Sequence, residues 1–181
     1  MNDEANPDSK RAKDLSLVAR LGVALCCFEG YCRGTRLESG SIRDFVEYMW
    51  EWPLMMTPGW FEEWEAKRPA LVETGLGDQI PGDVGVVLQQ RGIDEVEFRT
   101  LVENTVEIIW SSFFGASDNE GSLRHLSRVI SICGRRGIRP PPLEVFAESR
   151  FDEEQGWGCR LSIEQRNRWR ASRTSAGGSG T

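Results

Sequence analysis

The amino-acid sequence predicts an all-α fold, a single-domain bundle of about five to seven helices joined by irregular loops. Apolar residues recur at intervals of three and four in several segments, which is the period of one face of a helix. Residue types that begin and end helices stand at the borders of these segments. No stretch alternates apolar and polar residues over the length of a strand, and 181 residues suit one domain.

The first helix is expected between about Asp14 and Arg33. Its apolar residues cover a broad face, which is typical of a helix at the centre of a bundle. Gly34 follows at the position where a left-handed residue commonly ends a helix. The residues of this face are Leu15, Val18, Ala19, Gly22, Val23, Leu25, Cys26 and Cys32.

The next two helices are predicted from serine, threonine and proline positions. Residues 41–52 form the second helix, with Ser41 as its N-cap and Pro53 as its end. A third begins with Thr57 as cap and with Pro58 at the first helical position. Proline is tolerated there because the backbone N–H that it lacks would have no hydrogen-bond partner within the helix. Residues 69–82 are rich in proline and glycine, and we expect a loop there.

Two further helices are expected in the middle of the chain. A short one covers residues 83–90 and is ended by Gly92. Asp94 then caps a long amphipathic helix that reaches about Phe113.

Two capping boxes predict the last helices. Ser117 with Glu120 has the S-x-x-E spacing and opens a helix that ends in the GRRG sequence of residues 134–137. Ser162 with Gln165 has the S-x-x-Q spacing and opens the final one.

The helical domain is expected to span residues 14–171, between a flexible N-terminal segment, 1–13, and a disordered tail, 172–181. The N-terminus lacks the apolar stretch of a signal peptide, and the longest apolar run, Leu21–Phe28, is too short to cross a membrane. The five cysteines, two of them adjacent, do not suggest a disulfide framework. We therefore expect a cytoplasmic protein that does not bind membranes.

Charge is distributed unevenly along the chain, whose net charge is −6. Residues 44–65 hold six acids and neither lysine nor arginine. Residues 124–139 hold five arginines and no acid, and residues 160–173 hold five arginines and one glutamate. Because direct nucleic-acid binding usually needs a basic face, the acidic total argues against it. The arginine runs are then expected to pair with the acidic helices or to keep the surface hydrated.

A catalytic or metal site receives little support from the sequence. The chain has one histidine, His125, so it cannot form a zincin histidine pair, and Ser122 stands where a Glu-x-x-His metal motif needs glutamate. Most cysteines lie on predicted apolar faces, where inert burial is the usual role. We predict no cofactor and no metal. A small helical enzyme with a cysteine or carboxylate site near His125 remains an alternative.

Four of the seven tryptophans lie between residues 49 and 64, close to the acids. Trp60 and Trp64 are four residues apart and share a helix face, which we expect to pack inward. Trp50 and Trp52 are two apart and point in different directions on one helix, so at least one should be partly exposed or held by another segment. These tryptophans either pack in the core or anchor a protein-binding surface with an acidic rim.

Three motifs give the chain a resemblance to a known class of proteins. They are CCFEGYC in the first helix, FVEYMWEW in the second, and GWG at residues 156–158 before a helix that ends near Trp169. In this combination the chain resembles, over residues 17–169, helical immunity proteins encoded beside bacterial polymorphic or contact-dependent toxins. The resemblance implies a protein that binds one cognate toxin domain and occludes it. Such toxins are often basic nucleases, and their inhibitors carry an acidic face.

The functional hypothesis is therefore an immunity protein whose partner is a cognate toxin domain, possibly a basic nuclease. Besides the enzyme alternative, the chain could be a structural or regulatory module in which the tryptophans only brace the core. The predicted partner-binding residues are Asp44, Glu47, Trp50, Glu51, Trp52, Glu62, Glu63 and Glu65.

Overall fold

The fold is all-α, as predicted, in a computed structural model that describes residues 12–55 and 60–172. Within these ranges there are eight α-helices, more than expected, and no strand beyond one isolated bridge between Leu15 and Arg150. The helices are α2 (Leu17–Thr35), α3 (Gly40–Met55), α4 (Phe61–Glu65), α5 (Ala70–Gly75), α6 (Gly82–Arg91), α7 (Glu95–Trp110), α8 (Asn119–Arg135) and α9 (Ile163–Ala171). Three short 3-10 helices are η1 (Ala12–Asp14), η3 (Leu143–Phe146) and η4 (Glu154–Gly156).

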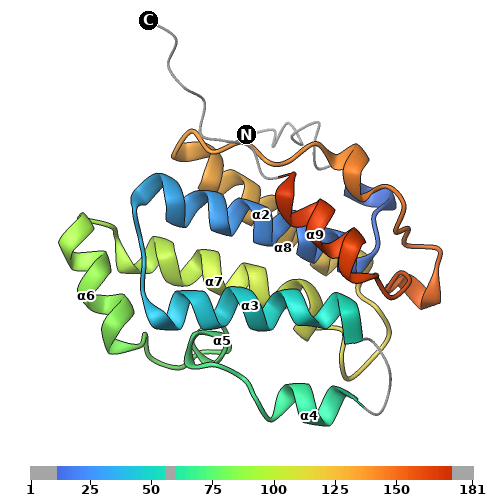
Figure 1. The fold of residues 1–181 in the computed structure, drawn as a ribbon, viewed down its shortest axis with the longest axis horizontal. Coiled ribbons are helices and arrows are strands. Elements are labelled where there is room, and N and C mark those ends of the chain that lie inside the picture. The colour runs from blue at the N-terminus through green and yellow to red at the C-terminus, as the bar shows by residue number, and fades with distance from the viewer. Residues whose placement is uncertain (1–11, 56–59, 173–181) are drawn as a thin grey trace, which may run out of the picture.

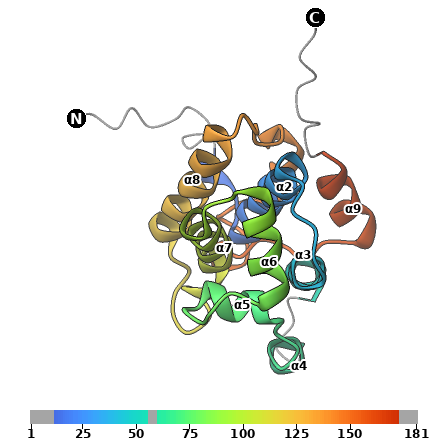
Figure 2. The ribbon, with the colours of Figure 1, turned by 90° about the vertical axis from the view of Figure 1, so that its left-hand side faces the viewer.

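Helix α2 lies at the centre of the bundle, as its broad apolar face predicts. Of its 19 residues, 15 are buried. It contacts α3, α7, α8, α9 and η3, so later parts of the chain surround it (Figures 1 and 2). Short helix α4 lies at one edge beside α3 (Figures 1 and 2). No helix of the described residues combines the length and the apolarity needed to cross a bilayer.

Helix α2 ends at Thr35, two residues later than the predicted end near Arg33. Ser16 caps its start by accepting a hydrogen bond from the Ala19 N–H at 3.1 Å. At the other end the left-handed residue is Arg36, with φ of 56°, and not Gly34, which lies inside the last turn. The Leu37 N–H then turns back to the Cys32 carbonyl at 2.8 Å, which satisfies an acceptor of that turn.

Both predicted ends of α3 are wrong. Ser39 and not Ser41 caps the start, because its Oγ accepts from the Ile42 N–H at 3.2 Å. Ser41 Oγ instead donates to Asp83 at 2.7 Å and joins α3 to α6. Pro53 lies inside the helix, near its end, and its carbonyl accepts from the Leu161 N–H at 2.8 Å. A proline this close to a C-terminus removes one hydrogen bond without ending the helix.

Residues 69–82 are not a loop throughout, because α5 forms within them. Pro69 precedes the first residue of α5 and Gly77, with φ of 115°, follows the helix, so both breakers stand outside it. Gly75 packs closely on α7, since a Cβ added to it would lie 2.7 Å from Val106. Pro69 and Gly77, which predicted a loop, therefore stand at the two borders of a short helix.

Of the other predicted helix ends, Asp94, Ser162 and Gly92 are confirmed. The Asp94 and Ser162 side chains accept from the backbone three residues later, and Gly92 ends α6 with φ of 62°. The Ser117 box is wrong, because Asp118 caps α8 by accepting from the Gly121 N–H at 2.8 Å.

Ala12 and Lys13, which were expected in the flexible N-terminal segment, belong to η1, and Ala12 is fully buried. The Thr57 cap, the Pro58 start, residues 1–11 and residues 173–181 lie outside the described residues.

The start of α2 is fastened by a buried arginine on this helix, Arg20. Its guanidinium donates five hydrogen bonds: to the carbonyls of Ala12, Lys13 and Asn119, and to the side chains of Asn119 and Ser122. Burial lowers the pKa of Arg20 from 12.5 to about 10, against the opposing influence of Asp14, so the side chain stays charged at neutral pH. One residue thus joins η1, α2 and α8.

The GWG sequence closes a backbone connection between the N-terminus of α2 and the segment before α9. The Val18 N–H donates to the Trp157 carbonyl at 3.3 Å, and the Ser16 N–H donates to the Ser149 carbonyl at 3.0 Å. The Ser16 and Ser149 hydroxyls share a buried hydrogen bond of 2.7 Å. Gly158, with φ of 84°, passes against both serines, and a Cβ added to it would lie 2.6 Å from Ser16 Cβ. Glycine is needed here for both backbone conformation and space.

Glu97 on α7 joins three helices through its carboxylate. It accepts from the Tyr31 hydroxyl at 2.7 Å and from Arg136 Nε at 2.9 Å. Burial would raise its pKa, but the hydrogen bonds from Tyr31 and Arg136 outweigh this and hold the pKa below the ordinary value of 4.5. A carboxylate with a lowered folded-state pKa stabilises the fold above its unfolded-state pKa, and this contribution is lost as the pH falls through the folded-state pKa.

The Glu97→Gln variant is therefore expected to lose about 1–3 kcal/mol of unfolding free energy at pH 7, the usual value of hydrogen bonds to a charged group. The difference from the unmodified protein should shrink as the pH falls below about 4.5, through the lowered folded-state pKa of Glu97. Urea denaturation at several pH values measures it. Glu103→Gln, an exposed glutamate on the same helix, is the control. A difference that stays constant with pH would contradict the role of the charge.

Candidate protein-binding surface

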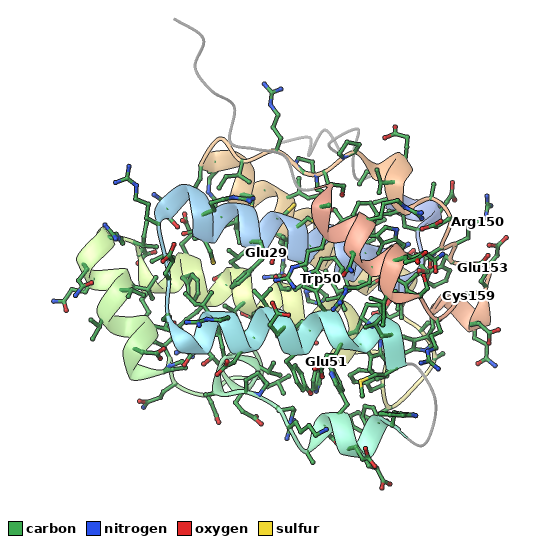
Figure 3. The ribbon with its side chains drawn as sticks, in the orientation of Figure 1. Glu29, Trp50, Glu51, Arg150, Glu153 and Cys159 are labelled. Carbon is green, nitrogen blue, oxygen red and sulfur yellow. The ribbon has the colours of Figure 1, made fainter. Side chains whose placement is uncertain are left out.

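Four of the six acids in residues 44–65 form an exposed acidic surface. Asp44 and Glu51 are seven residues apart on α3 and point the same way, while Glu62 and Glu63 lie in the first turn of α4. All four are exposed, and none has an ion-pair partner among the described residues. In Figure 3 Glu51 lies on the side of α3 toward α4. We call these four residues the acidic surface.

The other two predicted acids are engaged within the protein. Glu47 accepts from Arg170 of α9 at 2.7 Å, and this hydrogen bond lowers the pKa of Glu47. Arg170 also contacts Glu29 of α2 at 2.7 Å, so it links three helices. Glu65 pairs with Arg68 at 3.9 Å. Part of the charge that is segregated in the sequence is therefore balanced by contacts in the fold.

Neither Trp50 nor Trp52 is exposed, but the other predicted alternative is confirmed, because other segments of the chain hold Trp52. Trp50 is fully buried and Trp52 is 7% exposed, so neither presents an indole at the surface. They do point apart, but both sides of α3 are covered. Figure 3 places Trp50 on the side toward α2, and Trp52 contacts Trp64, Phe113 and Trp157. Trp64 packs inward as predicted.

Trp60 does not pack inward with Trp64, because its side chain is 49% exposed. It is the N-cap residue of α4, where its side chain makes no capping hydrogen bond.

An aromatic cluster holds α4 against the bundle. Tyr48 stacks on Trp64 with ring centroids 4.4 Å apart, and the Trp64 indole N–H donates to the Tyr48 carbonyl at 3.1 Å. Trp110 lies 5.2 Å from Trp64, and Phe61 lies 4.9 Å from Phe113. A helix of five residues is too short to be stable alone, so these contacts determine its position. The members are Tyr48, Trp52, Phe61, Trp64, Trp110, Phe113 and Trp157.

Sequence reasoning missed Phe114, which is 83% exposed. It follows the cluster member Phe113 in the turn after α7. The pair Phe113-Phe114 could have predicted this exposure, because two adjacent phenylalanines beyond the end of an amphipathic helix cannot both face the core.

The alternative site near His125 has an amide neighbour, Asn104, and two carboxylates, Glu103 and Asp118, whose charges act on the ring. His125 Nδ1 forms a hydrogen bond with Asn104 Oδ1 at 2.9 Å. Burial, with Arg128 and Arg124, lowers the pKa of His125, so the ring is neutral at pH 7. No group of three or more histidine, cysteine, aspartate or glutamate side chains among the described residues is placed to hold a metal ion.

The buried cysteines do not supply an activated thiol. Four of the five are buried, and Cys133 Sγ lies 3.5 Å from the Cys27 carbonyl in the core. Burial raises the pKa of Cys32 well above its ordinary value, which keeps this thiol protonated.

The acidic surface and the aromatic cluster are thus the features with which the described part of the chain could recognise another molecule. Comparisons with models of known protein families, with curated proteins and with solved structures give no match.

Proposed function

We propose that the protein is an immunity-type inhibitor that binds a basic toxin domain through the acidic surface. The observation that carries the proposal is the exposure of Asp44, Glu51, Glu62 and Glu63 without an internal cationic partner. No internal ion pair has to be broken before these carboxylates meet a partner, and they attract one of opposite charge over a distance. The buried core of α2 and the engaged Glu47 and Glu65 serve to hold this surface in place.

The partner is sought first in the protein encoded immediately upstream. We expect that protein to contain a toxin domain, to be toxic when produced alone, and to form a stable complex with this chain that abolishes its toxicity. An upstream product that is not a toxin, or that does not bind, would refute the proposal.

Charge reversal tests the surface itself. The double variant Glu62→Lys/Glu63→Lys should associate with the toxin domain about tenfold or more slowly at low salt, because steering accounts for one to several orders of magnitude in association rate. Stopped-flow fluorescence at several salt concentrations measures the rate, whose salt dependence should weaken.

A matched control is Glu120→Lys/Glu164→Lys, which changes the net charge equally with two exposed acids on α8 and α9. Equal slowing in both double variants would show that only net charge matters, and would contradict a defined surface.

A further inference from the structure

Three partly exposed aromatic rings from three chain segments, those of Phe61, Phe113 and Trp157, meet at the outer side of the aromatic cluster, and the exposed residues Trp60 and Phe114 adjoin two of them in the chain. Phe61 and Phe113 have centroids 4.9 Å apart, and Phe113 stacks on Trp157 at 5.4 Å with an interplanar angle of 12°. Trp60 precedes Phe61 in the chain, and Phe114 follows Phe113. Each therefore has its Cα atom about 3.8 Å from the Cα atom of its neighbour in the cluster. We call Trp60, Phe61, Phe113, Phe114 and Trp157 the aromatic edge.

This edge exposes far more apolar area than packing alone requires. Trp60 is 49% and Phe114 83% exposed, although both adjoin rings that are mostly covered. Exposed aromatic side chains beside a rigid, well-packed aromatic cluster are typical anchors of interaction sites. Fully buried Trp64 lies behind Phe61 and Phe113 and fixes them, so a partner would find a surface that is already ordered.

The charges around the edge select the partner. Glu62 and Glu63 follow Phe61 directly, and Glu154 lies beside Trp157, whose N–H donates to the Glu154 carbonyl at 3.1 Å. All three acids are exposed. Arg68, the arginine just after α4, is engaged by Glu65 at 3.9 Å and by Glu73 at 3.2 Å. The rim is therefore negative.

We propose that the aromatic edge receives an apolar side chain from a basic protein segment, in which lysine or arginine flanks that side chain. The cations pair with Glu62, Glu63 and Glu154, while the aliphatic or aromatic anchor and the stems of the cations cover the exposed rings. A second copy of this chain fits poorly, because a two-fold contact at the edge would bring like acids together. The inference rests on the proposed function only in that the partner is basic.

Defined peptides test the edge without the toxin. The probe is acetyl-Arg-Leu-Arg-Leu-Arg-amide, and acetyl-Arg-Gly-Arg-Gly-Arg-amide of equal charge is its control. Calorimetric titration should show the leucine peptide binding with a Kd about tenfold or more below that of the glycine peptide, and the Trp60 indole N–H resonance should shift on binding. Equal affinities, or shifts that avoid Trp60, would overturn the proposal.

Two double variants locate the site. Trp60→Ala/Phe114→Ala should abolish the preference for leucine over glycine, whereas Val86→Ala/Val96→Ala, which removes two exposed apolar side chains of α6 and α7, should leave it unchanged. Circular dichroism confirms that both variants fold. A preference that survives the first variant would overturn the proposal.

Two further outcomes separate the possibilities. If sedimentation shows a dimer that the Trp60→Ala/Phe114→Ala variant dissolves, the edge belongs to a second copy and the proposal is wrong. If the peptides bind as expected but the upstream protein does not, the edge stands and the inhibitor function fails.

Discussion

Replacing Arg20 with alanine is expected to lower the free energy of unfolding by about 3–5 kcal/mol. The substitution removes five hydrogen bonds at once and leaves the acceptors on Ala12, Lys13 and Asn119 without them. Each buried polar group that loses its partner costs about 1–3 kcal/mol, and partial access of water reduces the sum. Urea denaturation followed by circular dichroism measures the loss.

Two companion variants separate the causes. Arg20→Met keeps an apolar stem of similar length, so any stability it recovers over Arg20→Ala measures the packing of the side chain. Arg128→Ala removes an exposed arginine from α8 and should change stability by less than about 0.5 kcal/mol. If Arg20→Ala behaved like Arg128→Ala, the hydrogen-bonded hub would have no energetic importance.

The Gly158→Ala variant is expected to lose about 2–5 kcal/mol of unfolding free energy. A left-handed conformation costs a non-glycine residue about 1–2 kcal/mol, and overpacking a buried site costs about 1–3 kcal/mol more. The added methyl group would also separate Ser16 from Ser149, whose hydroxyls are hydrogen-bonded at 2.7 Å. Thermal and urea denaturation measure the loss.

Gly137→Ala provides the matched control. Gly137 has φ of 73°, close to that of Gly158, but a Cβ added there meets nothing within 4 Å. It should therefore show only the conformational cost, about 1–2 kcal/mol. Similar losses in the two variants would mean that the close approach to Ser16 and Ser149 is unimportant.

The sequence predicted helices well where a long apolar pattern and a local cap agree. The central position of α2 follows from its composition, and Asp94 and Ser162 cap helices because their hydrogen bonds involve only neighbouring residues. Predictions failed where the choice depended on distant contacts. Ser41 has a suitable side chain for a cap, but Asp83, 42 residues away, binds it. Pro53 was expected to end a helix that continues to Met55.

The candidate site was predicted in its charge and not in its aromatic part. Helical spacing states correctly that Trp50 and Trp52 point apart, but it cannot show that α2 covers one and α4 with the turn after α7 covers the other. Exposure of Glu62 and Glu63 follows from their charge alone. Engagement of Glu47 by Arg170, 123 residues later, could not be read from the sequence.

The connection between Ser16 and Ser149 spans 133 residues and joins the first long helix to the segment just before the last. Helix α2 therefore leaves the ribosome long before the elements that bury it, and contacts of such large sequence separation form slowly. Until α7 and α8 have been made, most of its apolar surface lacks the elements that bury it and is open to chaperones and to other nascent chains. The contacts with residues 149–158 then close the N-terminal end of α2, so the last part of this protection comes only when nearly all the described chain has been made.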